Sequence, residues 1–172
     1  MGNGFEKVTV HESPSSDLMV VEAPLTDPDG KPYKNLYVAG IDSIDMGKGD
    51  SPSDTDRSDF CVVIKRRTFG MTEPKYVAMY KARPNDIREA YDLTLKLLTW
   101  YNCQAMLEYT RIGIQQYFKE KHKDSLLMGR PEWSVGGGLV KKRSMKRLIG
   151  VSATESVIRH GLELIAHYIN DY

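Results

Sequence analysis

The chain has 172 residues, the size of one domain, which can bury about two-thirds of its unfolded surface. Hydrophobic residues make up 41% of it and charged residues 27%, and the formal net charge is +1. This composition argues against a disordered chain and against a strongly basic nucleic-acid binder. No segment reaches the roughly 18 apolar residues that span a membrane, and no signal peptide opens the chain, so we expect a cytosolic protein with no membrane partner.

Charge is unevenly distributed along the chain. Residues 42–59 contain six aspartates, whereas residues 119–147 contain nine lysines and arginines. This separation would suit a cation site beside a surface that binds a polyanion. The two cysteines, Cys61 and Cys103, lie in apolar runs without metal-ligand spacing, and we expect them to be reduced core residues.

The chain begins with a polar segment. Residues 1–35 contain several Pro-based turns and are interpreted as an N-terminal arm or linker, in which Leu18–Glu22 could form an edge strand. Residues 36–172 are the predicted domain. It opens with the apolar run Leu36–Ile41, which is typical of a strand buried on both faces and which ends in Asp42.

Two further strands and a helix follow. Residues 43–58 are rich in Gly, Ser, Asp and Pro and predict a loop. Phe60–Ile64 and Tyr76–Tyr80 then complete a three-stranded antiparallel meander. From Pro84, an apolar stripe with 3.6-residue spacing predicts a helix over residues 87–101 that covers one face of the sheet.

The second half of the chain repeats the pattern of a strand that ends in an acid. Cys103–Leu107 is the fourth predicted strand, and Glu108 follows it. Helical spacing resumes over residues 112–121, and a last helix over residues 153–169 has Thr154 as its N-cap. The sequence therefore predicts an α/β domain with a mixed sheet, in which parallel strands accompany the meander and helices flank the sheet.

Asp42 and Glu108 are the main candidate site residues. Each follows a strand at its carboxyl end, where an open α/β sheet places its reactive crevice. Carboxylates from separate strands can converge there on Mg²⁺ or Mn²⁺, and two such ions about 4 Å apart can activate a water and stabilise the leaving oxygen of a phosphodiester. The structural alternative is that both acids end their strands because Asp and Glu suit turns.

Three strands, a helix, a fourth strand ending in an acid and further helices form the order of an RNase H-like domain. Within that class the chain resembles the nuclease domain of the terminase large subunit, the DNA-packaging motor of tailed phages. The resemblance rests on Tyr37–Asp42 with the Gly/Asp-rich loop after it, on Ser58–Ile64, and on Met106–Glu108 followed by Gly113. It covers about residues 18 to 170.

The resemblance implies an endonuclease that cuts concatemeric viral DNA in the cytoplasm of an infected bacterium, with two Mg²⁺ or Mn²⁺ ions. Asp42 matches the family's first-strand metal ligand and Glu108 its fourth-strand acid. Asp59 matches an aspartate that lines the site without being a core ligand. Asp45 could take that supporting role instead, although a solvated loop acid is the simpler interpretation. The implied partners are double-stranded DNA and, in the full motor, the ATPase domain, the small subunit and the portal.

Two features of the family have no counterpart in the sequence. One is the third metal ligand, an aspartate near an Asp-Asp or Asn-Asp pair after the last strand; Asp171 is the one acid in a similar late position. We therefore expect a domain truncated at its C-terminus and a chain that is a weak or inactive nuclease. The other is the phosphate-binding loop of the ATPase domain, since Gly136–Lys142 has no buried strand before it and no GK[ST] sequence.

A basic cluster after this glycine run provides the candidate DNA contacts. Its members are Lys141, Lys142, Arg143, Lys146 and Arg147. In a nuclease they would contact backbone phosphates without base preference, whereas the alternative is an ordinary solvated turn. Arg111, three residues after Glu108, could steer a phosphate, pair with Glu108, or be a plain surface residue.

Two other functions are compatible with the same sequence. One is a non-catalytic DNA-binding or docking module, in which residues 119–147 bind and the sheet is a scaffold. The other is an RNase H-like resolvase or recombinase, which would share the acids without an ATPase. No Ser, Cys or His lies in a recognisable nucleophile motif, which agrees with hydrolysis by a metal-activated water.

Overall fold

The computed structural model describes residue 8, residues 10–44, 59–108 and 112–131, residue 134 and residues 148–171. The strands are β1 (Leu18–Val20), β2 (Tyr37–Asp42), β3 (Phe60–Arg66), β4 (Lys75–Ala82) and β5 (Gln104–Leu107). The helices are α1 (Ile87–Trp100), α2 (Gly113–Glu120), the short 3-10 helix η1 (Asp124–Leu126) and α3 (Glu155–Asp171). Every predicted strand and helix is confirmed with slightly shifted bounds, whereas η1 was not predicted from the sequence. In these parts of the chain, no helix is long and apolar enough to cross a membrane.

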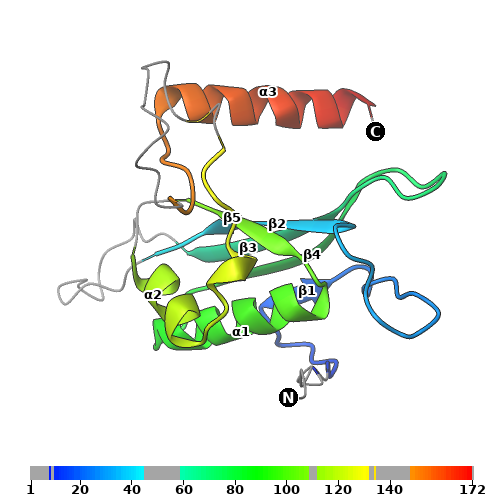
Figure 1. Cartoon of the computed structure of the whole chain (residues 1–172), viewed down its shortest axis with the longest axis horizontal. Coiled ribbons are helices and arrows are strands. Elements are labelled where there is room, and N and C mark those ends of the chain that lie inside the picture. The colour runs from blue at the N-terminus through cyan, green and yellow to red at the C-terminus, as the bar shows by residue number, and fades with distance from the viewer. Residues whose placement is uncertain are drawn as a thin grey trace.

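The strands form one mixed sheet in the order β1-β4-β3-β2-β5 (Figure 1). β2, β3 and β4 form the predicted antiparallel meander, and β1 adds an antiparallel edge strand beside β4. β5 lies on the other side of β2 and runs parallel to it, which requires the crossover through α1. From β4 to β5 this is the strand order of an RNase H-like sheet, so the predicted α/β fold class is confirmed.

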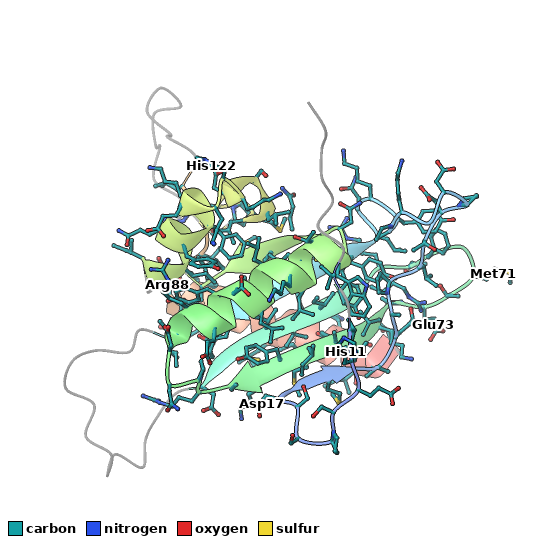
Figure 2. The ribbon with its side chains drawn as sticks, turned by 90° about the horizontal axis from the view of Figure 1, so that it is seen from below. His11, Asp17, Met71, Glu73, Arg88 and His122 are labelled. Carbon is teal, nitrogen blue, oxygen red and sulfur yellow. The ribbon has the colours of Figure 1, made fainter. Side chains whose placement is uncertain are left out.

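The core lies between one face of the sheet and helices α1 and α2. Side chains alternate along each strand, and those on this face are buried, including Ile41, Val62 and Leu107. α1 packs its apolar stripe on them, and the Asp86 side chain caps this helix by accepting a hydrogen bond from the Arg88 N–H at 2.9 Å. Figure 2 shows this face from below, with α1 along the sheet and α2 beside it.

The segment before β2 is held to the domain by specific contacts. Arg66, which is 8% exposed, forms an ion pair with Glu22, with Nη1 and Oε1 2.8 Å apart. The Tyr101 hydroxyl donates to the Glu22 carbonyl at 2.6 Å, and the Leu25 N–H donates to the Tyr37 hydroxyl at 2.8 Å. The part of the predicted arm around Glu22 and Leu25 is therefore packed on the end of the sheet.

α3 crosses the other face of the sheet, opposite α1 and α2 (Figure 1). None of its side chains is buried. Near its C-terminal end, Tyr168 lies with its ring centroid 4.0 Å from the Lys65 Nζ, and its hydroxyl donates to the Pro74 carbonyl at 3.3 Å. Just before the helix, the Val151 N–H donates to the Leu107 carbonyl of β5 at 2.8 Å.

Gly150 is a position where the backbone beside β5 requires glycine. Its φ is +79°, and an added Cβ would lie 2.5 Å from the Leu107 carbonyl oxygen. A side chain there would strain the backbone and push residues 148–151 away from β5. Gly30 has a similar φ of +77°, but an added Cβ would meet nothing within 4 Å.

We expect Gly150→Ala to lower the free energy of unfolding by about 2–4 kcal/mol and Gly30→Ala by about 1 kcal/mol, because only the first substitution adds a steric clash to the left-handed strain. Urea unfolding followed by far-UV circular dichroism measures both values. Equal losses in the two variants would mean that the close approach of Gly150 to Leu107 contributes nothing to stability.

Candidate active site

Asp42 and Glu108 are neighbours at one end of the sheet. Ile41 of β2 pairs with Leu107 of the parallel strand β5, and the Glu108 N–H donates to the Ile41 carbonyl at 2.9 Å. Because parallel strands end at the same edge of a sheet, the residues that follow this pair lie side by side. The structure thus brings together the two acids that the sequence singled out.

Both acids face the side of the sheet away from α1 and α2. Ile41 and Leu107 are buried under these helices, and successive side chains of a strand point to opposite faces. Asp42 is exposed and Glu108 is half-buried. The pair is therefore accessible on the face that α3 crosses.

The Asp42 carboxyl group lies close enough to Glu108 to affect its ionisation. Burial is the largest cause that raises the pKa of Glu108, and the charge of Asp42 and the hydrogen bond between the two side chains raise it further. Two ionised carboxylates held side by side repel each other. A divalent cation could bind beside both acids, because its charge would offset the repulsion between the two carboxylates.

Cys61 and Lys81 extend the acid pair into a row across the sheet. Asp42 is the register partner of Cys61 on β3, and Cys61 is the register partner of Lys81 on β4. Burial is the main cause that raises the pKa of the Cys61 thiol, followed by the charge of Asp42, while Lys81 acts in the opposite direction. The sequence analysis did not identify Lys81. Its position next to the buried Tyr80 in β4 could have placed it on the opposite face of the sheet, where the two acids lie.

Asp59 lies near the acid pair but forms a different contact. It precedes β3 by one residue and is two positions from Cys61, which places it about 7 Å along the strand on the same face. Its Oδ2 is 3.4 Å from the Lys81 Nζ. Within the described residues no three His, Cys, Asp or Glu side chains come together as a metal site. A supporting role for Asp59 stays a prediction.

The other predicted site residues lie elsewhere. Asp171 is the last residue of α3, whose 17 residues span about 25 Å, and it is the opposite end of this helix that adjoins β5. Asp171 is therefore distant from the acid pair. Asp45 and Arg111 fall outside the described residues. The same holds for the candidate DNA contacts, Lys141, Lys142, Arg143, Lys146 and Arg147.

Comparison of the chain with models of known protein families, and with curated proteins, gives no match. The resemblance to terminase nucleases therefore stays a prediction, which rests on the order of the elements and on the sequence motifs given above.

The raised pKa of Glu108 predicts how stability depends on pH. The pKa of Glu108 is higher in the folded chain than in the unfolded chain, so its protonated form stabilises the fold. This contribution to stability is fully present below the unfolded pKa and is lost as the pH rises through the folded pKa. Glu108→Gln removes this loss because glutamine does not ionise. In metal-free buffer we expect the variant to melt about 2 °C above the parent at pH 7 and to lose this advantage at pH 4.

Differential scanning calorimetry at the two pH values measures this difference. Glu12→Gln, the same change at an exposed glutamate before β1, serves as the control and should not alter the pH dependence. A Glu108→Gln protein whose Tm advantage is the same at both pH values would contradict the prediction.

Proposed function

We propose that this chain is a metal-dependent endodeoxyribonuclease of the RNase H-like class, resembling the nuclease domain of the phage terminase large subunit. The observation that carries the proposal is that Asp42 and Glu108 lie side by side at the carboxyl ends of two adjacent parallel strands. A strand order of the RNase H-like type supports it. The proposed reaction is hydrolysis of a phosphodiester bond in double-stranded DNA.

The acid pair fits a small divalent cation. Mg²⁺ and Mn²⁺ prefer oxygen donors, and Mg²⁺ is commonly held by one or two carboxylates together with waters and substrate phosphates. Such an ion, when bound, lowers the pKa of a water and polarises a phosphoryl oxygen. Asp42 and Glu108 would hold it, and the half-buried position of Glu108 would strengthen the attraction between its charge and the ion.

The expected second ion would need further oxygen donors. Among the described residues, none forms a cluster of three metal-binding side chains with the acid pair. Asp59 is the nearest other candidate, and its carboxylate is occupied by Lys81. The proposal therefore assigns one ion to Asp42 and Glu108, and leaves the second to donors outside these residues.

A non-catalytic DNA-binding or docking module is the second candidate function. The observation in its favour is that, in the described residues, no third metal ligand joins the acid pair. A site short of one ligand binds its ion weakly, whereas basic residues bind phosphates without any metal. A resolvase or recombinase would use the same acids, and its preference for a four-way junction over plain duplex DNA would distinguish it.

The nuclease proposal is tested by nicking of supercoiled plasmid DNA in the presence of Mn²⁺. We expect Asp42→Asn and Glu108→Gln each to lower the rate at least about 100-fold, because each removes one of the two carboxylates that hold the ion. Asp29→Asn, the same change at an exposed aspartate far from the pair in sequence, is the matched control and should cut within twofold of the parent.

Binding of Mn²⁺ measured by calorimetry gives a second reading that does not depend on activity. Loss of binding in Asp42→Asn together with loss of cutting supports a metal-dependent nuclease. A parent chain that neither binds Mn²⁺ nor cuts DNA, or an Asp42→Asn protein that cuts like the parent, overturns this proposal. A parent that binds DNA without cutting it would instead support the docking module.

The predicted DNA contacts are tested separately by the salt dependence of DNA binding. If Lys142 neutralises one phosphate, Lys142→Ala should reduce the slope of log K against log salt by about one, with little change in sequence preference. Lys34→Ala, a change at an exposed lysine before β2, is the control. An unchanged slope in Lys142→Ala would remove this residue from the proposed DNA contacts.

A further inference from the structure

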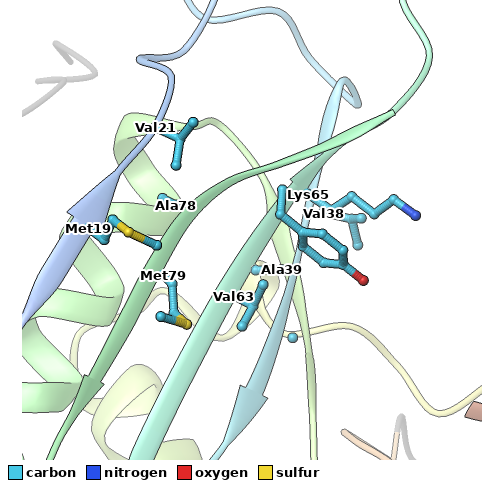
Figure 3. Close-up of a pocket in the computed structure, with 10 residues that line it drawn as sticks. Met19, Val21, Val38, Ala39, Val63, Lys65, Ala78 and Met79 are labelled. Atoms are coloured by element: carbon cyan, nitrogen blue, oxygen red, sulfur yellow. The ribbon is translucent and has the colours of Figure 1, made fainter. Parts of the chain in front are cut away.

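Part of the sheet face opposite α1 and α2 is apolar and exposed. A hollow of about 610 Å³ lies on it, and Figure 3 shows the side chains that surround it. The main apolar residues of its lining are Met19, Val21, Val38, Val63, Tyr76 and Met79. Met19 is 53% exposed and Met79 37%. Contiguous apolar surface of this kind is unfavourable in water and commonly marks a surface that another element covers.

α3 carries an apolar stripe on the side that faces this hollow. Val157, Gly161, Leu164 and Tyr168 recur at spacings of three and four residues, so they lie on one side of the helix. Val157, Gly161 and Tyr168 are the half-buried residues of α3, which places this side toward the sheet. Leu164 is nevertheless 56% exposed, and an added Cβ on Gly161 would meet nothing within 4 Å. Helix and sheet thus face each other across a gap.

The helix is attached to the domain at both ends of this gap. At one end, the Val151 N–H bonds to the Leu107 carbonyl at 2.8 Å. At the other, the Tyr168 ring packs against Tyr76 with centroids 5.3 Å apart and lies under the Lys65 ammonium. An element tethered in this way is held at high effective concentration opposite the surface that it complements.

We propose that α3 is a cover that moves toward the open face of the sheet between its two attachments and buries its apolar stripe in the hollow. Its own chain is the occupant that the observations favour, because a tethered helix avoids the entropy that a separate partner loses on association. Gly161, in the middle of the stripe, lets the helix backbone approach the sheet closely. Closure would remove Leu164 and Met79 from water together.

Closure would also change access to the acid pair. Asp42 and Glu108 lie on the covered face, and Val151, four residues before α3, pairs with Glu108 across a parallel bridge. The position of the helix is thereby coupled to the edge of the sheet that carries both acids. This consequence rests on the proposed function, whereas closure itself does not.

Cysteine labelling tests closure without any assay of activity. In a Cys61→Ser background, Met79→Cys places a thiol in the hollow, and Met71→Cys places one at the tip of the β3–β4 turn (Figure 2). The remaining Cys103 is buried, which raises its pKa to about 12 and keeps it unreactive. Exposures of 37% and 103% would alone give about a threefold difference in labelling rate. A closed cover predicts at least a 30-fold difference.

A matched pair of helix variants then identifies what protects the hollow. Leu164 and Leu162 are 56% and 61% exposed, but only Leu164 lies on the stripe. We expect Leu164→Gln to accelerate labelling of Met79→Cys at least fivefold, and Leu162→Gln to change it less than twofold. Neither leucine is buried, so both variants should fold, which far-UV circular dichroism checks.

Three results would overturn the proposal. Labelling of Met79→Cys within about threefold of Met71→Cys would mean that the hollow is open. Equal effects of Leu164→Gln and Leu162→Gln on the labelling rate would mean that the apolar stripe of α3 does not pack into the hollow. Protection that increases with protein concentration, together with a dimer in light scattering, would assign the hollow to a second copy of the chain. None of these results would affect the plasmid test of the nuclease proposal.

Discussion

The pairing of β5 with β2 is the constraint on which the site depends. β5 has only four residues, yet its register fixes which face Glu108 occupies, since a slip of one residue would turn every side chain to the opposite face. Ala105 and Leu107 hold this register because both are fully buried under the helices. On the outer side, the Met128 N–H donates to the Ala105 carbonyl at 2.8 Å, so the short strand is bonded on both edges. A well-held backbone can therefore keep two repelling acids together.

The sequence predicted the elements better than it predicted their partners. Apolar periodicity within a segment reveals a strand or a helix, and both acids were found because they follow such segments directly. The ion pairs were not predictable in this way: Lys81 meets Asp59, and Glu22 reaches Arg66, only after β4 and β1 have taken their places in the sheet. Local pattern carries no information on which distant charge a side chain will meet. For that reason the supporting role predicted for Asp59 ignored its pairing with Lys81.

The same limit applies to the two ends of the chain. Pro-rich, polar sequence before residue 36 suggested an arm, but a few well-placed groups suffice to attach it, among them the Tyr101 hydroxyl on the Glu22 carbonyl. The last helix was predicted correctly as an element. Amphipathic spacing states that a helix has a surface to bury, but it does not state how closely that surface packs. α3 has the stripe and no buried side chain.

The two faces of the sheet serve different physical needs. The face under α1 and α2 is closely packed, and its fully buried residues, such as Phe60 and Leu98, stabilise the fold. The other face combines an apolar hollow with the Asp42–Glu108 pair. Exposure of the hollow costs free energy, and so do the partial burial of Glu108 and the neighbouring charge of Asp42. A polar site beside an exposed apolar surface can be covered reversibly by a movable element. Permanent cover would block access to the site, whereas permanent exposure would leave the apolar surface in contact with water. α3 is attached near both ends and has open space beside Gly161 at its middle, which is the arrangement that the proposed cover requires.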